Sequence, residues 1–335
     1  MNYAQSILFG DRLALARLLT LVENNTPEGR DALDELFPHA GKAHLVGVTG
    51  SPGSGKSTLV NQIALDYRRR KEPKKVAIVA VDPSSPFTGG AVLGDRVRMR
   101  DLSGDSGVFI RSMATRGSLG GLAQSTAGVA QVFDAAGFEV VLIETVGAGQ
   151  AEVDIARLAH TTLVVEAPGM GDEIQAIKAG ILEIADILVI NKADHPGVDN
   201  TERALKSMLD LAHPVEKVFR HHGQTMTVSA PGVVQDPMLW IPPIVRTVAT
   251  EGSGITGLVE SISAHAEHLR QSGDWSKRER ARLETELDLM ITESLFSQFR
   301  AQVPDSRYDE IVNRLTERTL SPWEAVRSLM NGKKP

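Results

Sequence analysis

The stretch that decides the fold is residues 45–63, LVGVTGSPGSGKSTLVNQI. It opens with the apolar, β-branched run 45–49, which favours a buried strand, and it closes with the amphipathic run 59–63, which favours a helix. Between them, residues 50–58 fit the pattern G-x-x-x-x-G-K-[ST] at every position. A glycine-rich turn between a strand and a helix points backbone N–H groups at phosphate oxygens. The stretch therefore predicts a P-loop.

Different residues of this predicted P-loop are expected to bind the phosphates and the Mg²⁺ ion of a nucleotide. Lys56 is expected to reach the β- and γ-phosphates as a positive charge, and the Ser57 hydroxyl is expected to bind Mg²⁺. An incidental glycine-rich turn is the alternative, but a strand before the loop and a helix after it argue against that interpretation. The other expected nucleotide contacts are Gly50, Ser51, Pro52, Gly53, Ser54, Gly55 and Thr58.

Outside this stretch the chain alternates short apolar runs with helical patterns. The apolar runs are His44–Thr49, Val76–Asp82, Val140–Glu144, Thr161–Glu166, Ile187–Asn191 and Ile244–Ala249. Strands that are apolar throughout and separated by helices indicate a mainly parallel sheet covered on both faces. The predicted class is α/β, with the P-loop in the sheet domain.

Three parts are expected along the chain. Residues 1–42 form an N-terminal helical extension with an amphipathic helix at 11–19, and residues 43–270 form the P-loop domain. Residues 271–335 form a helical C-terminal arm, which opens with the charged run 277–282. Such a run is typical of a solvated helix face, and an interface arm is the alternative.

The composition excludes several classes of protein. The chain has 335 residues and a formal net charge of −6, whereas nucleic-acid binders carry a basic surface. It has no cysteine, which excludes disulfides and thiolate chemistry. No apolar run approaches the ~18 residues of a membrane span, and the first residues lack a secretory pattern. We expect a cytoplasmic globular protein with neither a nucleic-acid nor a membrane partner.

The predicted base-recognition motif is Asn191-Lys192-Ala193-Asp194, directly after the apolar run 187–190. A carboxylate at Asp194 can accept hydrogen bonds from guanine N1–H and from the exocyclic amine, which adenine does not match. N-K-x-D also occurs by chance in loops, but here it stands at a strand end after a P-loop. The motif predicts guanine specificity. The backbone at the end of the next run is expected to contact the base through Val248, Ala249 and Thr250.

Three carboxylates are expected around the γ-phosphate. Glu144 and Asp82 each end an apolar run, and Asp95 lies in a glycine-flanked stretch. The carboxyl ends of parallel strands meet at the ligand-binding edge of an α/β sheet. One such carboxylate alone would suggest a cap or a turn, but three beside a P-loop predict a Mg²⁺ and catalytic site. The N–H of Gly147 is expected to bond a γ-phosphate oxygen.

A set of short motifs resembles the MeaB/ArgK family of P-loop GTPases. The motifs are AVDPSS at 80–85, GG at 89–90, LGD at 93–95, RGSLGG at 116–121, ETVG at 144–147 and GDE at 171–173. The likeness runs from about residue 10 to residue 270. It implies a GTP-hydrolysing chaperone of an adenosylcobalamin-dependent acyl-CoA mutase, methylmalonyl-CoA mutase above all, which assists cofactor loading and protects the mutase. It also implies a Rossmann-like P-loop GTPase domain with helical extensions at both ends, and a homodimer formed through the C-terminal arm.

The resemblance also assigns roles to single residues. Lys56 and Ser57 match the P-loop lysine and the Mg²⁺ ligand of the family. Asp82, Asp95 and Glu144 resemble its magnesium and catalytic carboxylates. The implied cofactor is Mg²⁺, with GTP or GDP as the bound nucleotide.

Residues 168–178 resemble the loop through which the family senses its mutase, with Gln175 and Lys178 in matching positions. No glutamine directly follows Gly147; the first is Gln150. Without a group there to orient water, we expect slow hydrolysis by the isolated protein, with the partner completing the site through Gln175 or Lys178.

Other functions fit parts of the sequence. A metal-insertion GTPase normally offers cysteine or clustered histidine, and the chain offers only the pairs 221–222 and 265/268, the second expected on a surface helix. A kinase linked to amino-acid transport would use ATP, against which residues 191–194 argue. A scaffold that binds nucleotide without turnover remains a third alternative.

Overall fold

The computed structural model describes residues 2–83, 100–102, 104–115, 121–145, 150–169, 184–212, 217–221, 224–228 and 239–330. The chain divides into two compact units, residues 1–282 and residues 283–335. The predicted three-part division, with boundaries at 42/43 and 270/271, stays a prediction.

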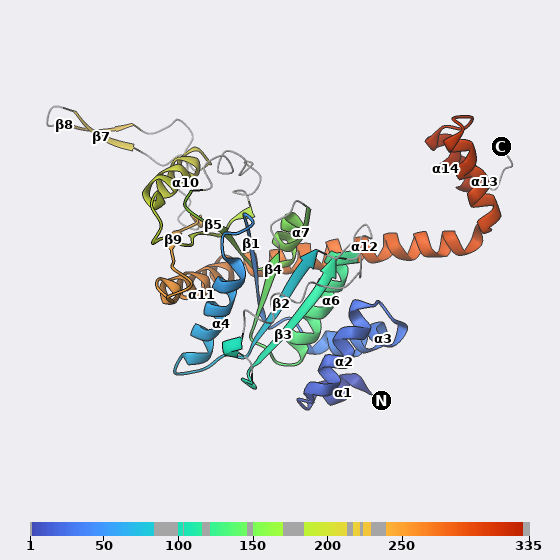
Figure 1. Ribbon diagram of the computed structural model, residues 1–335, viewed down its shortest axis with the longest axis horizontal. Helices are drawn as coiled ribbons and strands as arrows, with labels where there is room; N and C mark the ends of the chain where they lie inside the picture. The colour runs from blue at the N-terminus through green and yellow to red at the C-terminus, as the bar shows by residue number, and fades with distance from the viewer. Residues whose placement is uncertain are drawn as a thin grey trace. The chain divides into compact units, whose positions relative to one another are not determined.

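The first unit is built on a seven-stranded sheet in the order β3-β2-β4-β1-β5-β6-β9 (Figure 1). All neighbouring strands in it are parallel. The strands are β1 (His44–Gly50), β2 (Val76–Pro83), β3 (Val108–Thr115), β4 (Val140–Thr145), β5 (Thr161–Glu166), β6 (Ile187–Ile190) and β9 (Ile244–Arg246). Strands β1, β4, β5 and β6 are buried at every residue, because helices cover both faces. The predicted α/β class with a mainly parallel sheet is confirmed.

Two strand features lie outside the predicted apolar runs. Strand β3 forms one edge of the sheet beside β2, and its Arg111 and Ser112 interrupt the apolar pattern. Arg111 forms an ion pair with Glu23, so a polar residue is accommodated at this edge. Strands β7 (Lys217–His221) and β8 (Gln224–Val228) pair as a separate antiparallel sheet. Both features lack the continuous apolar run that predicted the other strands.

The helices lie in two layers against the sheet (Figure 1). Side chains alternate along β1: Leu45 belongs to one apolar cluster with α2 and α6, and Val46 and Val48 belong to another with α4 and α11. The helices of this unit are α1 (Tyr3–Leu8), α2 (Arg12–Glu23), α3 (Pro27–Leu36), α4 (Lys56–Arg69), α6 (Gly121–Ala135), α7 (Gln150–Leu158), α10 (Val198–Ala212) and α11 (Ile255–Ser272), with short 3₁₀ helices η1 (Phe37–His39) and η2 (Arg100–Leu102).

Two aspartates order the N-terminal segment by accepting hydrogen bonds from backbone N–H groups. Asp11 begins α2 by accepting hydrogen bonds from the N–H groups of Leu13 and Ala14 at 2.8 and 3.1 Å. Asp134 on α6 accepts from three successive N–H groups, those of residues 41–43. The predicted helix at 11–19 is therefore present as α2, and the segment that follows α3 is held to α6.

A buried group of histidines lies at the amino edge of the sheet, where β1, β5 and β6 begin. His44 Nε2 lies 2.7 Å from Thr161 Oγ1, which lies 2.8 Å from His265 Nδ1. His265 Nε2 lies 3.3 Å from a carboxylate oxygen of Asp186. Burial lowers the pKa of His265 to about 4 and holds the pKa of His44 well below its usual value. The expected surface position of His265 is therefore wrong: the side chain is 1% exposed, because α11 turns it toward the strand ends.

The first turns of α12 (Asp274–Gln302) pack onto the same edge. Trp275 stacks on His160, with ring centroids 3.9 Å apart. Arg278 donates two hydrogen bonds of 2.8 Å to the Asp186 carboxylate, and Glu279 lies 3.2 Å from His160 Nε2. The charged run 277–282 is thus a solvated face only in part. We call this set the amino-edge cluster: His44, His160, Thr161, Asp186, His265, Trp275, Arg278 and Glu279.

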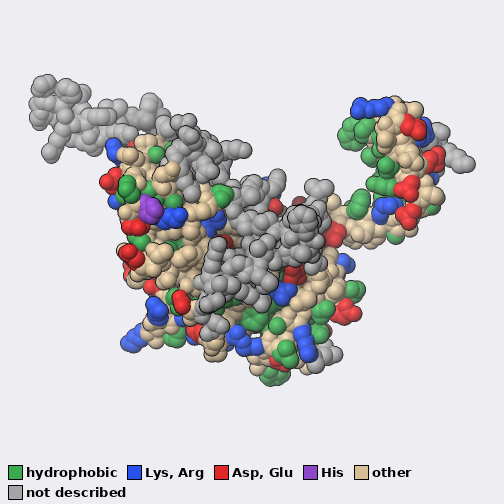
Figure 2. Space-filling model, in the orientation of Figure 1, with side chains coloured by type: hydrophobic (Ala, Val, Ile, Leu, Met, Phe, Trp, Pro, Cys, Tyr) green, Lys and Arg blue, Asp and Glu red, His purple; other side chains and the backbone are tan. Residues whose placement is uncertain are grey.

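The second unit contains the rest of α12, α13 (Asp305–Thr316) and α14 (Pro322–Met330). Within it, Arg307 donates to the carbonyl of Ser328 at 2.7 Å. No residue of α12 is buried, and Figure 2 shows hydrophobic side chains on the surface of this unit. No helix among the described residues combines the length and apolarity needed to cross a bilayer. The large exposed apolar side chains of α12 are Leu287, Met290, Ile291, Leu295 and Phe296.

Candidate nucleotide-binding site

The phosphate loop leaves the carboxyl end of β1 and enters α4 at Lys56. Gly50 has φ +129°, and a Cβ added there would lie 2.0 Å from the carbonyl oxygen of Val165. Gly55 has φ +91°, and its added Cβ would lie 2.5 Å from Asn191 Nδ2. Both glycines are therefore required by backbone conformation and by close neighbours. The loop forms the tight cradle that the sequence predicts.

Lys56 is buried at the start of α4, with 6% of its surface exposed. Its ammonium group donates to the carbonyls of Gly50 and Ser51 at 2.8 and 3.0 Å. The Lys56 side chain thus folds back over the phosphate loop, and its positive charge lies beside the backbone of that loop. A cation there fits the phosphate contact predicted for Lys56.

Ser57, in the first turn of α4, meets Glu144 on β4. The Ser57 hydroxyl donates to Glu144 Oε1 at 2.6 Å, since Glu144 on β4 is the register partner of Val48 on β1. Glu144 is 6% exposed. A hydroxyl and a carboxylate in contact are the hard oxygen ligands that Mg²⁺ prefers. The residues present therefore fit a Mg²⁺ ion beside the phosphate loop.

The predicted base motif is joined directly to the phosphate loop. Asn191, which follows β6, donates through Nδ2 to the Ser54 carbonyl at 2.8 Å. Lys192, at φ +55°, donates through Nζ to the Gly53 carbonyl at 2.8 Å. Two successive residues of the motif therefore hold two successive residues of the loop. The structure brings these two sequence motifs, 137 and 139 residues apart in these pairs, into one site.

Asp194, the last residue of the base motif, faces solvent. The side chain of Asp194 is 50% exposed and lies 3.9 Å from His195 Nε2. The segment after β9 lies nearby, because the Ala249 N–H donates to Asn191 Oδ1 at 3.1 Å. Val248 pairs with Ser253, and Thr250 is exposed. The residues expected to contact the base are thus gathered on one side of the phosphate loop.

Five other predicted site residues lie beyond what the structure describes, wholly or in their side chains. Asp82 lies at the carboxyl end of β2, and the structure describes its backbone alone. The register partner of Ala80 is Glu144, so β2 ends at the same edge. Asp95, Gly147, Gln175 and Lys178 lie outside the described residues.

One residue of the site was not predicted as functional. Glu166 ends β5, is 1% exposed, and accepts a hydrogen bond of 2.8 Å from the Ser51 hydroxyl of the phosphate loop. The available signal was a carboxylate at the end of an apolar run, the same signal that identified Glu144. Its partner lies 115 residues away, which no local pattern reveals.

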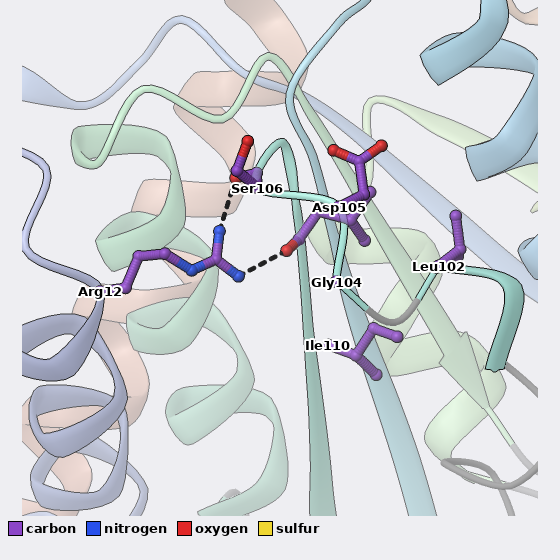
Figure 3. A pocket seen from close by; sticks show the side chains of 7 residues that line it. Arg12, Leu102, Gly104, Asp105, Ser106 and Ile110 are labelled. Carbon is purple, nitrogen blue, oxygen red and sulfur yellow. Dashed lines mark hydrogen bonds between the residues drawn. The ribbon is translucent and has the colours of Figure 1, made fainter.

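A cavity of about 440 Å³ lies elsewhere, beside the edge strand β3 (Figure 3). Arg12 lines it and donates to the carbonyls of Ser106 and Val108 at 2.5 and 2.8 Å. Asp105 lines it as well and is paired with Arg68. Its charged groups are already engaged, so this cavity is not assigned to a ligand. Among the described residues, no cluster of three or more histidine, aspartate or glutamate side chains could hold a metal ion.

Comparison with known proteins agrees with this geometry. The family model described as "Methylmalonyl Co-A mutase-associated GTPase MeaB" matches residues 15–304. A putative GTPase of Pyrococcus abyssi is 44% identical over 95% of this chain and 91% of its own. The GTPase ArgK of Escherichia coli is 33% identical over 96% of this chain and 92% of its own.

A solved structure is similar over nearly the whole length. The crystal structure of an LAO/AO transport system kinase superposes with a TM-score of 0.68 at 28% identity, covering 98% of this chain and 95% of that one. The match of the family model, the two GTPase relatives and the joined phosphate and base motifs lead to one conclusion. The chain belongs to the MeaB/ArgK family of methylmalonyl-CoA mutase-associated P-loop GTPases.

Proposed function

We propose that this protein is a Mg²⁺-dependent, homodimeric, cytoplasmic GTPase that serves as a chaperone of an adenosylcobalamin-dependent acyl-CoA mutase. The observation that carries the nucleotide part is the joining of the base motif to the phosphate loop, Asn191 to Ser54 and Lys192 to Gly53. A loop held in this way is pre-organised for a ligand that spans both motifs. A guanine nucleotide is such a ligand.

Guanine selection is assigned to Asp194. Its half-exposed carboxylate follows Asn191 and Lys192, which bond the phosphate loop. It can accept hydrogen bonds from both guanine N1–H and the exocyclic amine. Adenine presents an acceptor where guanine presents N1–H, so ATP would leave the carboxylate without its partner. Backbone groups of 248–250 complete the base pocket in this proposal.

Phosphate binding is assigned to the N–H groups of the loop 50–58 and to Lys56. Ser57 and Glu144, together with Asp82 and Asp95, would hold Mg²⁺, and the Gly147 N–H would donate to a γ-phosphate oxygen. When bound, Mg²⁺ neutralises charge on the β- and γ-phosphate oxygens. Lys56 stabilises the charge that develops there as the γ-phosphoryl group leaves.

The proposed mutase partner rests on the family and on the composition of the site. No glutamine directly follows Gly147 to orient water, so the isolated protein hydrolyses GTP slowly. In this proposal the mutase acts through residues 168–178, from which Gln175 or Lys178 would act on the γ-phosphate. One oriented hydrogen bond is enough, because each tenfold in rate needs about 1.4 kcal/mol.

The test is GTP hydrolysis with and without an adenosylcobalamin-dependent acyl-CoA mutase from the same organism. We expect the mutase to raise the rate at least roughly tenfold, and Gln175→Ala or Lys178→Ala to lose this stimulation while still binding GTP. An acyl-CoA enzyme without cobalamin is the control. Absence of stimulation by every such mutase would remove the chaperone role and leave the GTPase intact.

The proposed dimer uses the apolar stripe of α12. Leu287, Ile291 and Leu295 recur every four residues, so they share one face of the helix, and they are 57%, 46% and 61% exposed. A second copy of α12 would bury them. Replacing Ile291 and Leu295 with glutamate should give a monomer in analytical ultracentrifugation, whereas glutamate at Leu13, also 61% exposed on α2, should not. A wild-type monomer would refute the dimer.

A further inference from the structure

Glu166 is a buried carboxylate at the nucleotide edge that no sequence motif explains. It is the last residue of β5 and is 1% exposed. Its Oε2 accepts a hydrogen bond of 2.8 Å from the hydroxyl of Ser51, the second residue of the phosphate loop. A hydrogen bond to a carboxylate is about twice as strong as one between neutral groups. This hydrogen bond therefore restrains Ser51, and with it the start of the phosphate loop.

The main chain of Glu166 is tied to the base motif. Its carbonyl accepts from the Asn191 N–H at 2.8 Å, since β5 lies between β1 and β6 in the sheet. The preceding residue, Val165, is the register partner of Gly50. One residue thus contacts the phosphate loop through its side chain and the base motif through its backbone.

Ser51 is held from two sides. Glu166 holds its hydroxyl, and Lys56 Nζ donates to its carbonyl at 3.0 Å. The orientation of the Ser51 peptide decides where the first N–H groups of the cradle point. Without the side-chain contact, Ser51 would keep the carbonyl contacts with Lys56 Nζ and with the Ser54 N–H at 3.2 Å. It would lose its bond to the end of β5, and nucleotide binding would have to restore the register between the loop and that strand.

We propose that Glu166 is a positioning residue for nucleotide binding, acting through Ser51 to fix the phosphate loop in register with the base motif. This inference rests on the proposed guanine-nucleotide function. A purely structural carboxylate would stabilise the sheet edge without changing affinity. A positioning carboxylate changes affinity, depends on Ser51, and is replaceable by glutamine, whose amide oxygen still accepts from the hydroxyl.

The experiment is a titration of the full chain with fluorescently labelled GDP. Ser51→Ala and Glu166→Ala should each weaken binding about tenfold, and the double variant should be no weaker than either single one, because both remove the same contact. Glu166→Gln should stay within about threefold of wild type. Glu23→Ala is the matched control: it removes a carboxylate that is 13% exposed and paired with Arg111 of β3, away from the phosphate loop, and should leave the affinity unchanged.

Additive losses in the double variant, or wild-type affinity in Glu166→Ala, would overturn the proposal. A second measurement separates it from the failure of the proposed function. In nucleotide-free protein, amide hydrogen exchange of residues 50–57 should be faster in Ser51→Ala and Glu166→Ala than in wild type and in Glu23→Ala. If wild type binds no guanine nucleotide, the proposed function fails and this exchange decides the role of Glu166: unchanged exchange overturns it.

Discussion

Strands β1, β5 and β6 carry polar groups at both ends, and the two ends are built differently. At the carboxyl ends, Glu166 and Asn191 bond the phosphate loop through their side chains and each other through their backbones. At the amino ends, histidine, threonine and aspartate side chains pair with one another and with the start of α12. At the carboxyl edge these bonds hold the loops of the proposed nucleotide site, whereas at the amino edge the polar groups bond to one another. We therefore assign binding to the carboxyl edge and stability to the amino-edge cluster.

The comparison predicts its largest effect at the carboxyl edge. Lys56→Ala removes the buried ammonium beside the loop and should lower GTP hydrolysis about a thousandfold, with the fold retained, because charge stabilisation at the phosphates is lost. Hydrolysis rate and thermal midpoint are the two measurements. Lys206→Ala, which removes a 62% exposed lysine on α10, should change neither. An unchanged rate in folded Lys56→Ala protein would break the assignment.

The amino edge should respond to acid. Burial lowers the pKa of His265 to about 4 and lowers the pKa values of His44 and His160. As the pH falls, these histidines therefore become protonated in the unfolded chain at a higher pH than in the folded protein. Stability should therefore fall as pH drops from about 6.5 toward 4, by ~3 kcal/mol for His265 alone. Urea unfolding at pH 7.5, 6 and 5 measures it.

Two variants sharpen this acid response. His265→Gln should reduce the loss of stability at low pH, whereas His39→Gln, at an exposed position on η1, should not. Equal stability of the wild type at pH 7.5 and pH 5 would show that the cluster is not held neutral.

The smallest effect concerns the contact of α12 with the sheet. Arg278→Met leaves the Asp186 carboxylate, which is 8% exposed, without its bidentate partner. Removing one partner of a buried pair costs 3–5 kcal/mol, and we expect about 2 kcal/mol here because Arg278 is 37% exposed. Lys277→Met, at a 76% exposed neighbour, should stay within about 0.5 kcal/mol. GDP affinity should be unchanged in both variants. A loss of GDP affinity in Arg278→Met alone would contradict the assignment of binding to the carboxyl edge and of stability to the amino-edge cluster.

The sequence revealed the carboxyl edge far better than the amino edge. The residues of a P-loop or an N-K-x-D motif are close in sequence, so their chemistry is readable locally. The pairs of the amino-edge cluster join distant residues, such as His160 and Glu279, 119 positions apart. His265 and Arg278 therefore looked like residues of solvated helix faces. The role of Glu166 was not predicted because its partner Ser51 is also distant in sequence. Strand β3 was not predicted because Arg111 and Ser112 interrupt its apolar pattern.

The most direct test of the account is competition of GTP, ATP and xanthosine triphosphate for labelled GDP bound to the wild type and to Asp194→Asn. For the wild type, GTP should compete far better than ATP, by at least about a hundredfold, or 2.7 kcal/mol. Asp194→Asn should turn the preference toward the xanthine nucleotide, because the amide replaces an acceptor with a donor. Equal competition by ATP and GTP in the wild type would contradict the guanine assignment on which the proposed function depends.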